Sequence, residues 1–400
     1  MDPLVIVGAG MAAAGLVLSY RQIDVSRPIV VIGDEAHLPY SRPPLCKEFL
    51  TGAAGIDSLS LRQRAFYEER NVELRLADRA VSLDLEGRYV TLSSGSQLRF
   101  GDLVLATGAS NRRIPGFESA LDLRTVDDAM SLRAQLSAGT RVVIVGGGLI
   151  GLEVASSAIG MGARVAVLEA DQRLMSRIAS EALSSHVLDR ATRAGVGVHL
   201  GVGAERCDAQ GVRLRTGEVV RADVVVLAIG VVPNVELAAG AGLDVEGGIV
   251  VDEFLRTSAP GVFAIGDCAS YPVVGSGGSR RRLESVNNAN EQARQLAATL
   301  TGHSRPFNPT PTFWSHQFGD RIQIAGLACL GSTEVIRGDP TGGSFSIFRF
   351  DSGRLVAVES VNAPSDHVAA KRLVGSALAD RVTPAVVADP RTPLSDLVAH

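Results

Sequence analysis

The sequence predicts an α/β fold with two doubly wound, Rossmann-like units and a small C-terminal α+β domain. Strands and helices alternate from residue 4 to about 32 and again from 142 to 200, as they do in parallel sheets covered by helices. Each stretch opens with a glycine-rich turn between an apolar run and a helical run. The C-terminal domain is predicted from strand-like runs followed by a helical pattern, at 321–325, 345–350, 354–360 and 366–378.

The first glycine-rich turn follows the apolar run 4–7 and opens a helix that we expect to reach about Tyr20. Its residues are Gly8, Ala9, Gly10, Met11, Ala12 and Ala13. In such a turn the first glycine allows tight backbone geometry, the second lets the main chain approach a pyrophosphate, and a small third residue lets helix and strand pack. The strand expected at 29–32 ends beside Asp34 and Glu35. Either carboxylate could accept hydrogen bonds from ribose hydroxyls, so this stretch predicts a dinucleotide site.

The second turn repeats this pattern after the run 142–145 and opens a helix through Gly160. Its residues are Gly146, Gly147, Gly148, Leu149, Ile150 and Gly151. The next strand ends in Glu169, which would bond the two free hydroxyls of NADH and repel the 2′-phosphate of NADPH. NADH is therefore expected. Arg164 and Arg173 leave NADPH open, because an arginine beside this strand can accept a phosphate.

Three more apolar strands end in turns whose residues are candidates for cofactor binding, and the glycines of the first two are expected to mark where the chain leaves one nucleotide-binding unit. The first runs into Ala106, Thr107 and Gly108, the second ends at Gly230, and the third ends at Gly266 and Asp267. Asp267 could form a hydrogen bond with a ribityl chain; the alternative is that it is an ordinary turn residue. Residues 112–115 and 231–234 are expected to be crossovers between domains.

Composition narrows the class of protein. The chain has 400 residues, of which 46% are hydrophobic and 20% charged, enough for two or three domains with sizeable cores. Its net charge of −4 argues against a nucleic-acid partner. No apolar run is long enough to cross a bilayer, so we expect a cytoplasmic protein. The cysteines are too scattered to indicate a metal site, an iron–sulfur cluster or a dithiol relay: Cys46, Cys207, Cys268 and Cys329.

With these motifs assembled, the chain resembles the FAD-dependent, NADH-dependent ferredoxin reductases of bacterial oxygenase systems. The segments that carry the resemblance are 8–13, 39–47, 106–108, 123–125, 146–153, 262–269 and 283–286. It implies a glutathione-reductase-like architecture with bound FAD and with NADH as cosubstrate. The domains it implies are an FAD domain at 1–112 and 236–316, an NAD domain at 113–235 and a C-terminal domain at 317–400.

The resemblance also assigns roles to single residues. Lys47 and Glu153 match an ion pair beside the flavin. The pair would orient the nicotinamide ring and bias the flavin potential rather than act as acid and base; two unrelated surface charges are the alternative. Trp314 resembles an aromatic residue near the flavin edge, and core packing is its alternative. The residues that the resemblance places at FAD are Ala12, Asp34, Arg42, Val81, Arg124, Asp267, Glu284, Ser285 and Val286, together with Lys47.

The implied electron acceptor is a 2Fe-2S ferredoxin that serves a monooxygenase or dioxygenase, and the reductase is expected to be a monomer or a dimer. Arg280, Arg281 and Arg282 could form a basic docking face, although they are also typical of a solvated loop. Three alternatives stay open. The acceptor could be a rubredoxin, the chain could be a redox-sensing binding protein that resembles apoptosis-inducing factor, or it could be an NADH oxidase or peroxidase. The last would use Cys46, where the family usually has serine.

Overall fold

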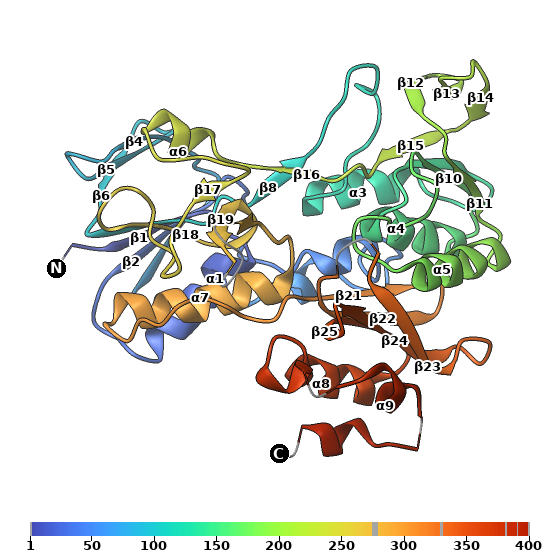
Figure 1. The fold of residues 1–400 in the computed structure, drawn as a ribbon. Coiled ribbons are helices and arrows are strands. Elements are labelled where there is room, and N and C mark those ends of the chain that lie inside the picture. Colours follow the sequence, from blue (N-terminus) through green and yellow to red (C-terminus); the bar gives the residue numbers. More distant parts are fainter. Residues whose placement is uncertain (1, 274–278, 329–330, 381, 390, 399–400) are drawn as a thin grey trace. The chain divides into compact units, whose positions relative to one another are not determined.

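The computed structural model describes residues 2–273, 279–328, 331–380, 382–389 and 391–398. Cys329 lies outside these residues. The chain divides into two compact units (Figure 1). Unit 1 comprises residues 1–41, 56–110 and 231–309, and unit 2 comprises 42–55, 111–230 and 310–400. The chain passes between them beside two short paired strands, β8 (Ala109–Asn111) and β16 (Val231–Pro233).

A five-stranded parallel sheet forms the centre of unit 1, in the order β18-β7-β1-β2-β3. Every residue of β1 and β2 is buried, which explains why both strands are continuous apolar runs rather than alternating ones. Helices α1 and α7 pack against each other beside this sheet (Figure 1). The bounds are β1 Leu4–Val7, β2 Ile29–Ile32, β3 Val72–Arg75, β7 Asp102–Leu105, β18 Val262–Ala264, α1 Met11–Arg21 and α7 Val286–Leu300.

Smaller elements complete unit 1. Two further three-stranded sheets have the orders β4-β5-β6 and β17-β19-β20. Their strands are β4 Ala80–Asp84, β5 Tyr89–Leu92, β6 Gln97–Arg99, β17 Ile249–Val250, β19 Ala269–Pro272 and β20 Arg280–Arg281. The short helices are η2 Ile56–Leu59, α2 Arg64–Glu68, α6 Glu236–Gly240 and η3 Gly266–Cys268.

The first part of unit 2 contains a second parallel sheet, in the order β11-β10-β9-β15. Helix α3 begins with a capping box between Thr125 and Asp128, and Ser180 caps α5. The residues between β11 and β15 form a small antiparallel sheet, in the order β12-β13-β14. The bounds are η1 Pro43–Cys46, α3 Val126–Gln135, β9 Arg141–Val145, α4 Leu149–Gly160, β10 Arg164–Glu169, α5 Glu181–Arg193, β11 Gly197–Leu200, β12 Ala204–Asp208, β13 Gly211–Leu214, β14 Val219–Arg221 and β15 Val224–Leu227.

The end of unit 2 is an antiparallel sheet in the order β21-β22-β25-β24-β23, followed by short helices that pack on it. Phe348, Val358 and Leu373 are fully buried between sheet and helices. The bounds are β21 Thr312–Gln317, β22 Asp320–Gly326, β23 Thr333–Asp339, β24 Ser344–Asp351, β25 Arg354–Val361, α8 Pro364–Leu373, η4 Ala377–Asp380, α9 Pro384–Ala388 and η5 Leu394–Leu397.

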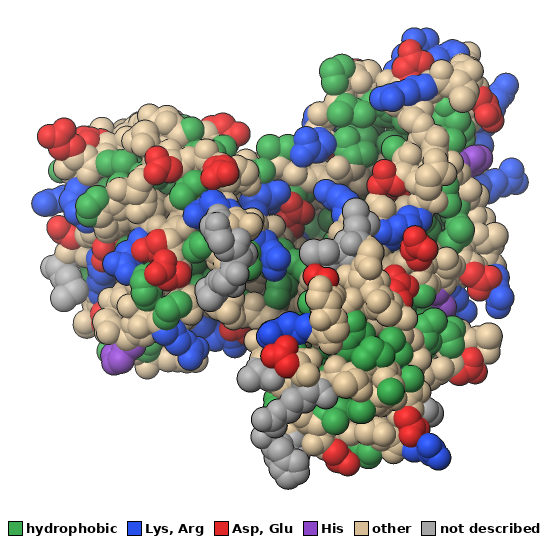
Figure 2. All heavy atoms as spheres, viewed as in Figure 1, with side chains coloured by type: hydrophobic (Ala, Val, Ile, Leu, Met, Phe, Trp, Pro, Cys, Tyr) green, Lys and Arg blue, Asp and Glu red, His purple; other side chains and the backbone are tan. Residues whose placement is uncertain are grey.

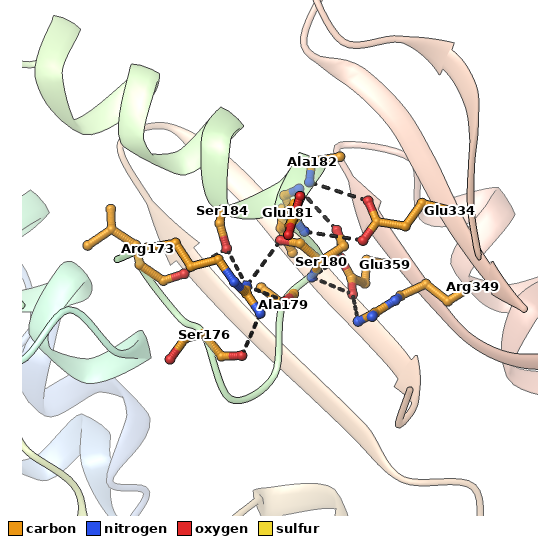
Figure 3. Close-up of polar contacts among 12 residues, drawn as sticks. Arg173, Ser176, Ala179, Ser180, Glu181, Ala182, Ser184, Glu334, Arg349 and Glu359 are labelled. Carbon is orange, nitrogen blue, oxygen red and sulfur yellow. Dashed lines mark hydrogen bonds and ion pairs between the residues drawn. The ribbon is translucent and has the colours of Figure 1, made fainter. Parts of the chain in front are cut away.

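Two carboxylates of this C-terminal sheet bind the N-terminus of α5 (Figure 3). Glu359 accepts hydrogen bonds from the Ser180 amide at 3.0 Å and the Ser180 hydroxyl at 2.5 Å, and it is paired with Arg349. Glu334 accepts longer bonds from the amides of Glu181 and Ala182. Since α5 has unpaired amides and positive dipole charge at that end, these carboxylates attach the C-terminal sheet to the nucleotide-binding part of unit 2.

The predicted fold class is confirmed: both parallel, Rossmann-like sheets and the C-terminal α+β domain are present. Strands β21 and β23 were not predicted, and α8 ends at Leu373, earlier than the helix expected to reach residue 378. The helix stops there because Gly375 adopts a φ of +76° two residues later. The three domain boundaries expected from the sequence stay a prediction.

Candidate functional site

The first glycine turn, in unit 1, contains two glycines whose surroundings differ. Gly8 has a φ of +111°, and a Cβ there would lie 2.1 Å from the Ala106 carbonyl oxygen, so no larger residue fits. Gly10 is different, because a Cβ there would meet nothing within 4 Å. Glycine at this position therefore keeps space open above the backbone, which is where a pyrophosphate approaches the N-terminus of α1.

The turns after β1, β7 and β18 lie at one edge of the unit 1 sheet. Gly8 contacts the Ala106 backbone, and a Cβ at Gly266 would lie 3.1 Å from the Ala12 side chain. Asp267 follows Gly266 in η3. Thr107 and Asn234 exchange hydrogen bonds of 2.7 and 2.9 Å, which fix the turn after β7.

The two acidic residues after β2 differ in their surroundings. Asp34 is exposed beyond the end of the strand. Glu35 accepts a hydrogen bond of 2.6 Å from the Tyr40 hydroxyl. Asp34 is thus the carboxylate that a ribose could reach without displacing the Tyr40 contact.

The remaining predicted FAD residues of unit 1 lie near the start of α7 or on β4. Ser285 caps α7 by accepting from the Asn288 amide, and Val286 is the first helical residue. Glu284 pairs with Arg282 at 2.7 Å. Val81, on β4, is 54% exposed. The contacts of Glu284, Ser285 and Val286 with FAD stay predictions.

The second glycine turn, in unit 2, repeats the first. Gly146 has a φ of +112° and a Cβ there would lie 2.4 Å from the Ala228 carbonyl oxygen, whereas a Cβ at Gly148 would meet nothing within 4 Å. Gly151 packs so closely that its Cβ would lie 2.2 Å from the Gly146 oxygen. Leu149 and Ile150 begin α4, and Ile150 is 42% exposed. As in the first turn, a Cβ would collide with the backbone at the first glycine and would meet no atom at the second. Gly230, which follows β15, has a φ of +95°.

Glu169 stands beside this turn and accepts a hydrogen bond of 2.7 Å from the Gly147 amide. Arg164 and Arg173 were the reason that NADPH stayed an alternative, and neither lies where it could bind a 2′-phosphate beside Glu169. Arg164 begins β10 while Glu169 ends it, so at about 3.3 Å per residue they lie roughly 16 Å apart along the strand. Arg173 directs its guanidinium to the carbonyls of Ser176 and Ala179 and to the Ser184 hydroxyl (Figure 3).

The predicted pair of Lys47 and Glu153 is present in unit 2. The Lys47 Nζ lies 2.5 Å from Glu153 Oε2, and the side chains are only 11% and 6% exposed. Lys47 also donates to the Pro43 carbonyl at 3.0 Å, and its Nζ lies 5.1 Å from the centre of the Trp314 ring. The alternative of two unrelated surface charges is excluded by this contact and burial.

Cys46 adjoins this pair as a buried, protonated thiol. Burial, followed by the negative charge of Glu153, raises the pKa of the Cys46 thiol. Its Sγ donates to Glu153 Oε2 at 2.9 Å. A thiolate is the form that reacts with oxidants, so these surroundings disfavour the peroxidase-type chemistry considered for this residue.

Residues that the sequence did not single out complete the cluster. The Ser315 hydroxyl of β21 donates to Glu153 Oε1 at 2.6 Å, and the Ser157 hydroxyl of α4 donates to the Cys46 carbonyl at 2.6 Å. Only the position of Ser157, four residues after Glu153 on one helix, could have indicated its role. Ser315 lies far away in the sequence and shows no local signal.

Arg42 and Arg124, both predicted at FAD, lie together in unit 2. The Arg42 guanidinium donates to the Arg124 carbonyl at 2.6 Å. This contact brings the start of η1 to the start of α3, whose capping Thr125 follows Arg124. The structure therefore joins the Arg42 guanidinium to the Arg124 backbone, and a phosphate role for the two arginines stays a prediction.

Comparisons with known proteins show the family to which the chain belongs. The family model for pyridine nucleotide-disulphide oxidoreductases matches residues 2–293, and a reductase C-terminal model matches 312–398. The chain belongs to the pyridine nucleotide-disulphide oxidoreductase family. As a member of this family it takes FAD and NAD(H), which confirms the two cofactors expected from the sequence.

Individual relatives extend over the whole chain. Rhodocoxin reductase of Rhodococcus erythropolis is 41% identical over 96% of this chain and 92% of that protein. A ferredoxin reductase for the CYP199A2 system from Rhodopseudomonas palustris has a TM-score of 0.95 and 41% identity, covering 100% of both chains. The covalent putidaredoxin reductase–putidaredoxin complex gives a TM-score of 0.94 and 34% identity, covering 100% of this chain and 98% of the other. The resemblance drawn from the sequence is confirmed.

Within the described part of this oxidoreductase, no helix is long and apolar enough to span a membrane. Among the same residues, no three His, Cys, Asp or Glu side chains are grouped so that they could hold a metal ion.

Proposed function

We propose that this chain oxidises NADH and passes the electrons, by way of FAD, to a 2Fe-2S ferredoxin of an oxygenase system. The observation that carries the proposal is the pair of glycine turns, each with open space above its second glycine. When bound, FAD accepts electrons as a pair and can release them singly. The ferredoxin reductases similar to this chain, one of them in a covalent complex with putidaredoxin, support this class of acceptor.

We assign each turn to one dinucleotide. The turn of unit 1, with Gly8, Gly10, Ala12 and Ala13, would hold the FAD pyrophosphate, and Asp34 its ribose. The turn of unit 2, with Gly146, Gly148 and Gly151, would hold NADH, and Glu169 would select it against NADPH by charge. The assignments of Glu35, Val81, Thr107, Asp267, Ser285 and Trp314 to cofactor contacts stay predictions.

Lys47 and Glu153 would orient the nicotinamide ring. Their charges are paired and shielded from water, so moving a proton from Lys47 to Glu153 would neutralise both groups without supplying an acid to NADH. A fixed buried pair instead provides a constant field and a rigid wall, which favours a reactive orientation of the ring.

For docking of the ferredoxin we single out Arg281. Arg280 directs its guanidinium to the carbonyls of Val251 and Ser270, and Arg282 pairs with Glu284 and donates to the Asp267 carbonyl. Two of the three cations are thus engaged within unit 1. On the face drawn in Figure 2, acidic and basic side chains are interspersed among the coloured residues. Steering depends on the summed charges of a docking face, and Arg281 would contribute one positive charge to it.

The decisive experiment is cytochrome c reduction with NADH or NADPH, with purified electron carriers added singly. We expect turnover with NADH, stimulated by a 2Fe-2S ferredoxin and much slower with NADPH. Stimulation by a rubredoxin alone would replace the acceptor that we propose. A purified protein that stays colourless after incubation with FAD would exclude the function altogether.

The competing oxidase function predicts oxygen consumption that depends on Cys46. The buried thiol and its raised pKa oppose it. Under air, we expect slow oxygen uptake that is unchanged in Cys46→Ser. A binding protein like apoptosis-inducing factor would instead change its state of assembly when NADH is added, which sedimentation detects; a monomer or dimer that ignores NADH fits the reductase. A cytoplasmic location stays a prediction.

A further inference from the structure

The carboxylate of Glu153 receives hydrogen bonds from three side chains. Oε2 accepts from Lys47 at 2.5 Å and from Cys46 at 2.9 Å, while Oε1 accepts from Ser315 at 2.6 Å. Both oxygens are therefore engaged, and the side chain cannot rotate without breaking a bond. Ser315 is fully buried and Cys46 is 5% exposed, so water cannot readily replace either donor.

These donors come from separate elements that α4 holds together. Glu153, Ser156 and Ser157 lie on one face of α4, at spacings of three and four residues. Ser157 holds η1 by donating to the Cys46 carbonyl, and Ser156 holds the β21–β22 turn by accepting from the Phe318 amide at 2.8 Å. The two segments that carry the donors, η1 and β21, are thus both fixed to the helix that carries Glu153.

We propose that Ser315 and Cys46 are positioning residues, which fix the Glu153 carboxylate so that it holds Lys47 in place. This inference rests on the proposed role of the Lys47–Glu153 pair in hydride transfer from NADH. It assigns a function to the C-terminal domain, since β21 supplies Ser315. It also explains the cysteine: the thiol donates the hydrogen bond that a serine hydroxyl could donate at the same position.

Strand geometry explains how β21 serves the pair twice. Successive side chains of a strand point to opposite faces. Ser315 is buried against Glu153, whereas its neighbour Trp314 is 42% exposed and lies over the Lys47 ammonium. The buried hydroxyl fixes the anion, and the exposed ring packs against the cation.

A first test observes the thiol without NADH. The infrared S–H stretching band of Cys46 is assigned by its loss in Cys46→Ser, using FAD-loaded protein. A thiol that donates to a carboxylate should give a band that weakens and moves to higher frequency in Glu153→Gln. An unchanged band in Glu153→Gln would overturn the contact and with it the inference.

A second test measures anaerobic flavin reduction by NADH in a stopped-flow instrument, without any ferredoxin. Misplacing a group at the reacting centre by about 1 Å can cost about a hundredfold in rate. For the smaller displacement that follows the loss of one donor, we expect about a tenfold decrease for Ser315→Ala and for Cys46→Ala. Ser315→Thr and Cys46→Ser, which keep a donor, should retain most of the rate. In a Glu153→Gln background, neither alanine substitution should slow the reaction further, because residues that act through one group are not additive.

The matched control is Ser346→Ala. Ser346 is also fully buried on the C-terminal sheet, but its hydroxyl bonds to Ser360 at 3.0 Å instead of Glu153. We expect no change in flavin reduction. Additive losses for Ser315→Ala and Glu153→Gln would overturn the positioning role while leaving the pair itself important. If Glu153→Gln alone left the rate intact, the proposed role of the pair would fail, whatever the infrared band showed.

Discussion

Glu169 is the single residue on which the choice between NADH and NADPH depends. Its carboxylate is aligned by the Gly147 amide, and Arg173 is occupied elsewhere. Glu169→Gln keeps an acceptor for that amide but removes the charge. A hydrogen bond to a charged group is worth about 1.5–3 kcal/mol, so kcat/KM for NADH should fall roughly tenfold or more while that for NADPH rises.

Steady-state kinetics with both nucleotides check this shift in preference. Glu205→Gln is the control, because Glu205 is an exposed acid on β12 of the same unit. An unchanged NADH to NADPH ratio in Glu169→Gln would mean that another residue discriminates.

His367 on α8 should make stability depend on pH. Burial, with the nearby charges of Lys371 and Arg321, lowers its pKa from 6.5 to about 4. Below pH 6.5 the unfolded chain takes up a proton that the folded chain refuses until about pH 4. The stabilisation present above pH 6.5 is therefore lost as pH falls through this window, by about 3 kcal/mol.

Thermal unfolding of the wild type and of His367→Gln at pH 7.5 and pH 4.5 measures this loss of stability. The wild type should lose more stability on acidification than the variant does. His303→Gln, which removes an exposed histidine, should behave as the wild type. Equal losses in all three proteins would contradict the assignment.

At the scale of elements, the two glycine turns separate folding from ligand binding. Gly10→Ala and Gly148→Ala introduce a Cβ that meets no protein atom, so both variants should fold. Gly10→Ala should lose FAD, because the methyl group occupies the space of the pyrophosphate. Gly148→Ala should keep FAD and bind NADH at least tenfold more weakly, since about 1.4 kcal/mol of lost contact suffices for that change.

Flavin absorbance and NADH titration distinguish the two variants. Gly8→Ala serves as the contrast, because its Cβ would collide with the Ala106 carbonyl and its φ is positive; we expect little folded protein. If Gly148→Ala released FAD instead, our assignment of the turns to their dinucleotides would be reversed.

The attachment of α5 to the C-terminal sheet should contribute measurably to stability. Ser180→Ala removes a helix cap and leaves buried Glu359 without one of its donors (Figure 3). We expect a loss of about 1–3 kcal/mol in the free energy of unfolding. Urea denaturation measures it. Glu334→Gln, which weakens only longer and more exposed contacts, should cost less than about 1 kcal/mol.

At the scale of the whole molecule, the sequence allowed prediction of those features that a local pattern or the family resemblance indicates. The turns at Gly8 and Gly146 follow from local pattern, because glycine spacing and strand ends are adjacent in the chain. The contact between Lys47 and Glu153 came from the resemblance, and no spacing in the chain would have supplied it. Ser315 was missed because its partner is distant in sequence and an isolated strand serine carries no signal. Arg280 and Arg282 were grouped with Arg281 by sequence, although their guanidinium groups donate to carbonyls of distant segments, Val251 for Arg280 and Asp267 for Arg282.

Electron delivery by the whole molecule should respond to Arg281 through salt. Arg281→Glu reverses one charge on the proposed docking face, so kcat/KM for the ferredoxin should fall several-fold at low ionic strength and less at high ionic strength, where charges are screened beyond about 3–10 Å. Flavin reduction by NADH should not change, because the substitution leaves both glycine turns and the Lys47–Glu153 pair intact. Arg372→Glu, on exposed α8 surface, controls for net charge. Equal losses in both variants, or a loss that persists in high salt, would place the docking face elsewhere on the molecule.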